Sequence, residues 1–299
     1  PPRSTLFPYT TLFRSAGTWW QRKAVKESLK NYAQVLFAGG LAAVYFTTYA
    51  AHHIPTLRVI ESVLLDGGLL SAWAGFMVWI ADRKKSEVLA LFAVGLAYYA
   101  AVMTRIGSFT LYSNLLLTIA AVFFLVRNRW AGLTFASLVA TYAAYAFWRF
   151  YNGSEWHWAT PEEGLWQGTY FLMCYWLVFT AAVFLSRHGQ FAGTNRATFL
   201  TLNNVEFFVL FLLTMLQVRE GKFWQFSLSY GVVLLACAEA ARRFLSADAL
   251  TKNSYLTQGL VLVTIGLIAK YNGLQLALLL GAESVVLLTL GVARNSFIL

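Results

Sequence analysis

Five carboxyl side chains lie inside apolar stretches of the chain, where an acid is costly and therefore points to function. A charge at the centre of a bilayer costs roughly +2.5 kcal/mol or more. A carboxyl group buried in hydrocarbon can hold a proton at neutral pH, and proton-coupled transport needs such a group. From the deepest to the most superficial, the five acids are Glu283, Glu206, Asp66, Glu61 and Glu239.

Each of these acids also has a purely structural explanation. Glu283 and Glu206 could be protonated and hydrogen-bonded to a neighbouring helix. Glu239 could form an interfacial pair with Arg243, four residues further along the same helix. The sequence DGG at 66–68 fits either close helix packing or a broken helix at a binding site. The candidate intramembrane polar sites are therefore Glu283, Glu206 and Asp66, with Asn203 and Asn204 beside the second of them.

Amides and glycines within the apolar stretches favour packing roles. Asn114, Gln258 and Gln275 are expected to link helices by hydrogen bonds. Gly259 and Gly266 are expected to let two helices approach closely.

The composition predicts the elements that must position these groups. The chain is 59% hydrophobic and 12% charged, against about 25% charged residues in soluble domains. Its apolar blocks are about 20 residues long, the length that crosses a bilayer core. We therefore predict an all-α, polytopic transmembrane helical bundle of about ten spans. The expected spans are Asn31–Ala51, Val59–Ile80, Glu87–Thr104, Leu111–Val126, Trp130–Phe150, Trp166–Ser186, Thr198–Val218, Trp224–Leu245, Ser254–Lys270 and Leu274–Val292.

Basic residues are distributed unequally between alternate connections. Fifteen Lys and Arg fall on one side of the predicted spans and six on the other. Because positive charge is retained in the cytoplasm, the richer side is predicted to be cytoplasmic, with both ends of this fragment there. The formal net charge of +10 is thus explained by membrane topology, and no nucleic-acid motif accompanies it. The alternation also pairs the spans into hairpins in series, which fits an internal repeat or simply the short loops of a membrane protein.

The first fifteen residues, PPRSTLFPYTTLFRS, differ from everything that follows. They form neither a signal peptide nor an amphipathic helix, and they resemble a translated sequencing adapter. We predict a non-native segment at 1–15, a basic cytoplasmic or interfacial lead-in at 16–30, and a single transmembrane domain at 31–299, truncated at both ends.

Recognisable catalytic and metal-binding patterns are absent from the sequence. It contains no HExxH, Walker or GxSxG motif, and we expect no metal or cofactor. His52 and His53 are adjacent, and neighbouring helical side chains point about 100° apart, so they fit a helix end better than a shared ion. Cys174 and Cys237 show no disulfide or metal spacing. The longest connection is predicted to face outward with three acids that a transferase could use, namely Glu155, Glu162 and Glu163.

Three stretches carry a resemblance to a known family. They are YAQVLFAGGLAAVYFTTYAAHH, ADRKKSEVLALFAVGLAYYA and LTQGLVLVTIGLIAKYNGLQLALLLGAESVVLLTLG. From about Lys30 onward the chain resembles the bacterial predicted membrane proteins of domain of unknown function 2339. The resemblance implies a long array of membrane helices but no particular activity, and Glu283 falls in the GAESVVLLTLG motif.

Three functions remain open at this point. The first is a cytoplasmic-membrane transporter or permease for a small molecule or an envelope precursor, using the intramembrane acids. The second is a non-catalytic membrane scaffold with unidentified protein partners. The third is an envelope glycosyl or lipid transferase that uses the loop acids.

Overall fold

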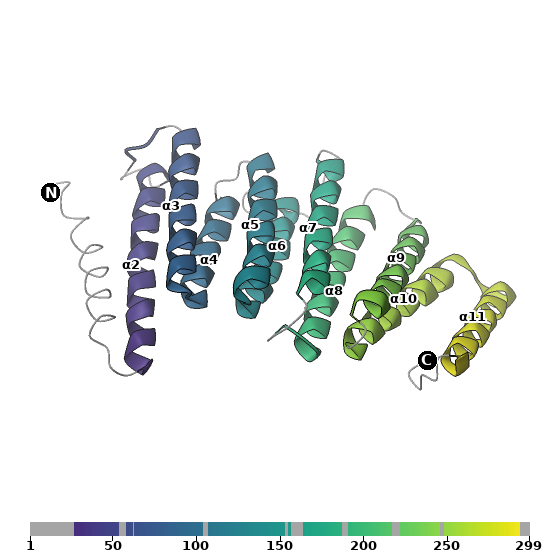
Figure 1. The fold of residues 1–299 in the computed structure, drawn as a ribbon. Coiled ribbons are helices and arrows are strands. Elements are labelled where there is room, and N and C mark those ends of the chain that lie inside the picture. Colours follow the sequence, from purple (N-terminus) through teal and green to yellow (C-terminus); the bar gives the residue numbers. More distant parts are fainter. Residues whose placement is uncertain are drawn as a thin grey trace. The chain divides into compact units, whose positions relative to one another are not determined.

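The described part of the protein is built almost entirely from helices (Figure 1). A computed structural model describes residues 27–53, 58–61, 63–103, 107–152, 155–156, 164–186, 191–216, 222–245 and 248–293. Within these ranges there are ten helices, and each of the ten predicted segments overlaps one of them. The helices are α2 (Glu27–His53), α3 (Val63–Lys84), α4 (Glu87–Met103), α5 (Gly107–Asn128), α6 (Ala131–Phe150), α7 (Leu165–Leu185), α8 (Thr194–Leu216), α9 (Phe223–Phe244), α10 (Ala249–Lys270) and α11 (Gly273–Ala293).

Five of the described helices are long and apolar enough to cross a membrane. The qualifying stretches are Thr110–Asn128, Ala131–Phe150, Leu165–Leu185, Thr194–Met215 and Phe223–Phe244. The helical membrane class is therefore confirmed, whereas the remaining five crossings stay a prediction.

The chain divides into two compact units. Unit 1 is Pro1–Trp148 and unit 2 is Arg149–Leu299. The two-residue strands β1 (Tyr151–Asn152) and β2 (Glu155–Trp156) pair antiparallel at the start of unit 2. The predicted boundary at residue 15 lies outside the described residues, and α2 begins within the predicted lead-in at 16–30.

Unit 1 buries one stripe of each apolar helix. In α2, Phe37, Leu41 and Tyr45 recur every four residues and are at most 4% exposed, the spacing that aligns side chains on one helical face. They join a core with residues of α3 and α4 such as Met77 and Ala93. Because these helices are apolar on every face, hydrophobicity does not select the face that is buried. Close packing between helices selects it instead.

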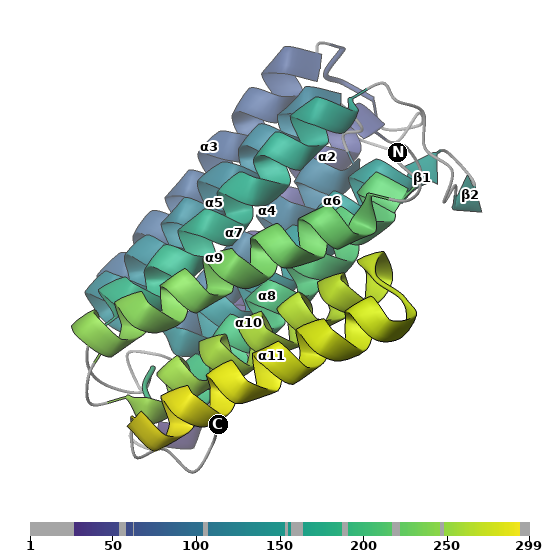
Figure 2. The same cartoon turned by 90° about the vertical axis from the view of Figure 1, so that its right-hand side faces the viewer.

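Unit 2 is organised around α10, which contacts α8, α9 and α11. The closest approach is between α9 and α10, where a Cβ on Gly231 would lie 2.9 Å from the Gly259 carbonyl oxygen. A Cβ on Gly266 would lie 2.7 Å from the Leu228 side chain. The expected packing role of Gly259 and Gly266 is confirmed. Figure 2 shows α11 lying beside α10.

Candidate functional site

The polar centre of unit 2 is a network of amides deep in the helices. Asn204 of α8 accepts a hydrogen bond from Trp176 Nε1 of α7 (2.9 Å) and one from the Tyr230 hydroxyl of α9 (3.3 Å). Its Nδ2 donates to Gln258 Oε1 of α10 (2.7 Å), and Gln258 Nε2 donates to Thr201 Oγ1 (2.8 Å). One asparagine thus joins four helices, and the prediction that Gln258 links helices is confirmed.

Asn203 contacts the backbone of Trp176, whereas Asn204 contacts its indole ring. Asn203 is 1% exposed, and its Nδ2 donates to the Trp176 carbonyl oxygen (3.3 Å) and to Thr180 Oγ1 (3.2 Å) of α7. Adjacent helical residues point about 100° apart, so the asparagine pair serves two separate contacts. Together they fix the position of α8 against α7 and α10.

Glu206 lies two residues beyond the asparagine pair in α8. The side chain is half-buried, and its Oε2 is fully buried, with no hydrogen-bond partner in the described part of the chain. A buried polar atom without a partner costs about 1–3 kcal/mol. The structure therefore leaves one oxygen of this carboxyl group open to a proton or to a polar guest.

Glu283 lies near the middle of α11 and contacts a different helix. Its Oε1 accepts a hydrogen bond from Thr264 Oγ1 of α10 (2.8 Å). Glu206 and Glu283 therefore lie on separate helices of unit 2, and among the described residues no hydrogen bond joins them.

The remaining predicted acids are distributed elsewhere. Asp66 belongs to α3 of unit 1, which continues unbroken through 66–68, so the broken-helix alternative is wrong. The Asp66 side chain lies outside the described part of the structure, as do residues Glu162 and Glu163. Glu155 belongs to strand β2. At the end of α9, Glu239 Oε1 accepts from Arg243 Nε (2.9 Å), and this predicted pair is confirmed.

Unit 1 has a polar centre made of hydroxyl groups. The Tyr98 hydroxyl of α4 lies 2.7 Å from Thr141 Oγ1 of α6, which lies 3.0 Å from Thr118 Oγ1 of α5. All three residues are at most 5% exposed. The predicted helix-linking role of Asn114 is wrong, because neither polar atom of its side chain has a partner.

Sequence reasoning missed a buried ion pair in unit 2. Arg196, near the start of α8, contacts Asp248 (3.1 Å), and their side chains are only 3% and 12% exposed. Arg196 also donates to the carbonyl oxygens of Ser186 and Phe191. Asp248 caps α10 by accepting from the Thr251 backbone N–H (3.1 Å). An aspartate at the start of an apolar helix is a capping signal. This signal could have revealed the cap at Asp248, although not its pairing with Arg196.

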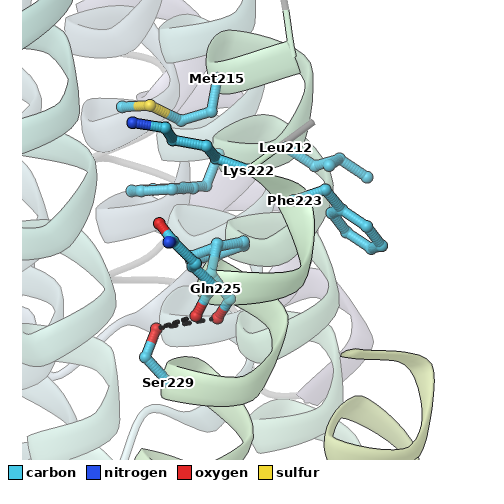
Figure 3. Close-up of a pocket in the computed structure, with 8 residues that line it drawn as sticks. Leu212, Met215, Lys222, Phe223, Gln225 and Ser229 are labelled. Carbon is cyan, nitrogen blue, oxygen red and sulfur yellow. Dashed lines mark hydrogen bonds between the residues drawn. The ribbon is translucent and has the colours of Figure 1, made fainter. Parts of the chain in front are cut away.

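A pocket of about 260 Å³ opens between the end of α8 and the start of α9 (Figure 3). Its wall is largely apolar, and the Phe211 and Phe226 rings stack with centroids 3.9 Å apart. Lys222, Gln225 and Ser229 supply its polar groups. The full lining is Phe211, Leu212, Met215, Lys222, Phe223, Gln225, Phe226 and Ser229.

These apolar helices, with polar groups held between them, define an integral membrane protein of the helical class. The chain belongs to the family described as Predicted membrane protein (DUF2339), whose model matches residues 11–298. The match begins within the segment that resembles an adapter. No curated protein and no solved structure matches the chain.

Proposed function

We propose that this protein is a proton-coupled permease of the cytoplasmic membrane, with Glu206 as the group that carries the proton. The observation behind the proposal is the buried Oε2 of Glu206, which has no hydrogen-bond partner among the described residues and lies two residues along α8 from the asparagine that joins four helices. In this mechanism a proton from one face binds the carboxylate and leaves to the other face, in step with the substrate. Glu283, bonded to Thr264, and Asp66 are secondary candidates for the same role.

The pocket at the α8–α9 end suggests the class of substrate. Stacked aromatic rings suit an apolar chain, while the Lys222 ammonium group is complementary to an anionic head. An anionic amphiphile, such as a lipid-linked envelope precursor, combines both chemistries. The basic α7–α8 and α9–α10 turns would face the cytoplasm, because they carry five of unit 2's ten Lys and Arg and a sixth, after α11, falls on the same side, against four on the other. The pocket would then open on the opposite side of the membrane.

Proteoliposomes with a trapped pH-sensitive dye provide the test. An anionic isoprenoid phosphate is added under an imposed pH gradient, and internal pH is followed. The wild type should move protons when this amphiphile is added, and Glu206→Gln should abolish the response without changing the amount of folded protein. The matched control is Glu239→Gln, because Glu239 is paired at the end of α9 and should keep the wild-type response.

Other outcomes would overturn the proposal. A wild type that gives no proton movement, or a Glu206→Gln variant that responds like the wild type, would leave no role for the carboxyl group. If Glu206→Gln and Glu239→Gln both have no effect, and the phenotype instead follows the loss of a co-purifying protein, the scaffold function would be favoured. Transfer of the isoprenoid phosphate to an acceptor, with sensitivity at Glu155, Glu162 or Glu163, would favour the transferase.

A further inference from the structure

A buried polar stripe runs along α6 in unit 1. Thr134, Ser137 and Thr141 are separated by three and four residues and are each 0% exposed, so they lie on one helical face. The Thr134 and Thr141 hydroxyls contact the Ala121 carbonyl oxygen (3.5 Å) and the Thr118 hydroxyl (3.0 Å) of α5. The stripe therefore faces the interior of unit 1.

Hydrogen-bond geometry in the centre of this stripe can be worked out donor by donor. Thr141 Oγ1 donates to the Ser137 carbonyl oxygen (2.7 Å), and Thr118 Oγ1 donates to the Asn114 carbonyl oxygen (2.7 Å). A hydroxyl has one hydrogen and two lone pairs. The Tyr98 hydroxyl is then the donor to Thr141 (2.7 Å), and each of the three hydroxyl hydrogens has an acceptor.

One polar group beside this stripe is not satisfied. Asn114, one turn from Thr118 and about 6 Å along the α5 axis, is 0% exposed, and neither its Oδ1 nor its Nδ2 has a hydrogen-bond partner among the described residues. Each such atom costs about 1–3 kcal/mol, and buried polar groups without a protein partner are commonly bound to ordered water.

We propose that unit 1 contains an internal water site at Asn114, between α5 and its neighbours. Asn114 presents an unpaired acceptor together with an unpaired donor. Water can satisfy both, whereas a metal cation would need several oxygen ligands and would be repelled by the amide hydrogens. The site lies one helical turn from Thr118 and therefore borders the buried Tyr98, Thr141 and Thr118 hydroxyls. This site is independent of the permease proposal, which concerns unit 2.

Two measurements on the purified full chain test the water site. The first is X-ray radiolytic labelling in ¹⁸O water, in which an ordered internal water oxidises the side chains beside it. The second is the thermal unfolding midpoint of Asn114→Leu, which has a similar volume but no polar atoms. A hydrated site predicts ¹⁸O labelling of Tyr98 in the wild type, reduced several-fold in Asn114→Leu, together with a lower midpoint.

A dry site predicts the opposite sign. Leucine would then remove an unsatisfied amide, the midpoint would rise, and Tyr98 would remain unlabelled in the wild type; either result overturns the proposal. Asn204→Leu in unit 2 is the matched control. It should lower the midpoint because Asn204 is hydrogen-bonded, but it should leave the Tyr98 labelling at the wild-type level.

Discussion

The two units join their helical hairpins at the basic turns with different chemistry. In unit 1, Asp82 of the α3–α4 turn accepts from Asn128 (2.8 Å) and from Lys85 (2.9 Å), with Arg127 3.4 Å away. The Lys85 and Arg127 side chains are more than half exposed. In unit 2, the corresponding link between Arg196 and Asp248 is buried.

This difference shows that the burial of the ion pair, more than the presence of an acid among basic residues, decides how much such a cluster contributes to stability. An exposed ion pair contributes little to stability because water and salt screen it. A buried pair contributes through the cost of leaving one charge alone, which makes it a strict requirement for the fold. The basic turns look alike in sequence, yet their described ion pairs differ in burial, and we expect unit 2 to depend more strongly on its own.

The largest expected effect is that of Arg196→Met. It leaves Asp248 without its cation, and removal of one partner of a buried pair costs about 3–5 kcal/mol. The measurement is chemical unfolding in detergent, with hydrogen exchange to locate the loss in α7, α8 and α10. Combining Arg196→Met with Asp248→Asn should recover part of the stability, since asparagine still caps α10. A double variant as unstable as the single one would show that the charge balance is irrelevant.

Backbone proximity provides the second contrast between the units. Gly231→Ala places a methyl group 2.9 Å from the Gly259 carbonyl oxygen, and overpacking of this kind costs about 1–3 kcal/mol. Gly95→Ala in α4 of unit 1 is the control, because nothing lies within 4 Å of its Cβ position. The control should be neutral or stabilising in the same unfolding assay. Equal losses in both variants would contradict a special α9–α10 contact.

A third substitution tests a capping contact within unit 1. Glu87 Oε1, at the start of α4, accepts from the Leu133 backbone N–H at the start of α6 (2.8 Å). Glu87→Ala should cost about 0.5–2 kcal/mol, the usual effect of losing a helix cap, and should speed amide exchange at Leu133. Glu87→Gln keeps an acceptor oxygen and should lie near the wild type. Unchanged exchange in Glu87→Ala would exclude the cap.

The smallest expected effect is that of Asp82→Asn. The hydrogen bond from Asn128, then that from Lys85, lowers the pKa of Asp82 below its ordinary value. A lowered pKa gives stability that is fully present above the ordinary aspartate value of about 3.9 and is lost as pH falls through the folded-state value. As the pH is lowered, the thermal unfolding midpoint of the wild type should therefore decline slightly more than that of Asp82→Asn. A steeper decline in the variant would contradict the assignment.

The positions of the helices could be predicted, because blocks of about 20 apolar residues leave few alternatives. Their ends were less accurate where polar residues continue the helix. The predicted span Ser254–Lys270 begins five residues after α10 does, because Asp248 starts that helix through its cap. Hydropathy registers the apolar length of a segment and takes no account of a capping hydrogen bond.

The polar partners could be predicted only in part. Asn203, Asn204 and Gln258 stood out because amides are rare in apolar helices, but their connection through Trp176 and Tyr230 depends on how four helices pack. Hydroxyls such as Thr118 and Thr141 gave no signal, since threonine is common in membrane helices. The partnerless Glu206 oxygen could be recognised only once the surrounding side chains had been placed.

The turns of unit 1 end their helices in an unusual way. Lys85 and Arg129 follow α3 and α5 with φ of 49° and 62°, a left-handed conformation that is costly for residues other than glycine. In unit 2, α7 is followed by Ser186 with a φ of −83°, and the left-handed residue of that connection is Gly193 (φ 57°), directly before α8. An engineer seeking thermostability would place glycine at both positions in unit 1. Doing so would remove two positive charges of the kind that orient hairpins during membrane insertion. Stability of the folded protein and correct insertion into the membrane therefore make opposing demands on the same two residues.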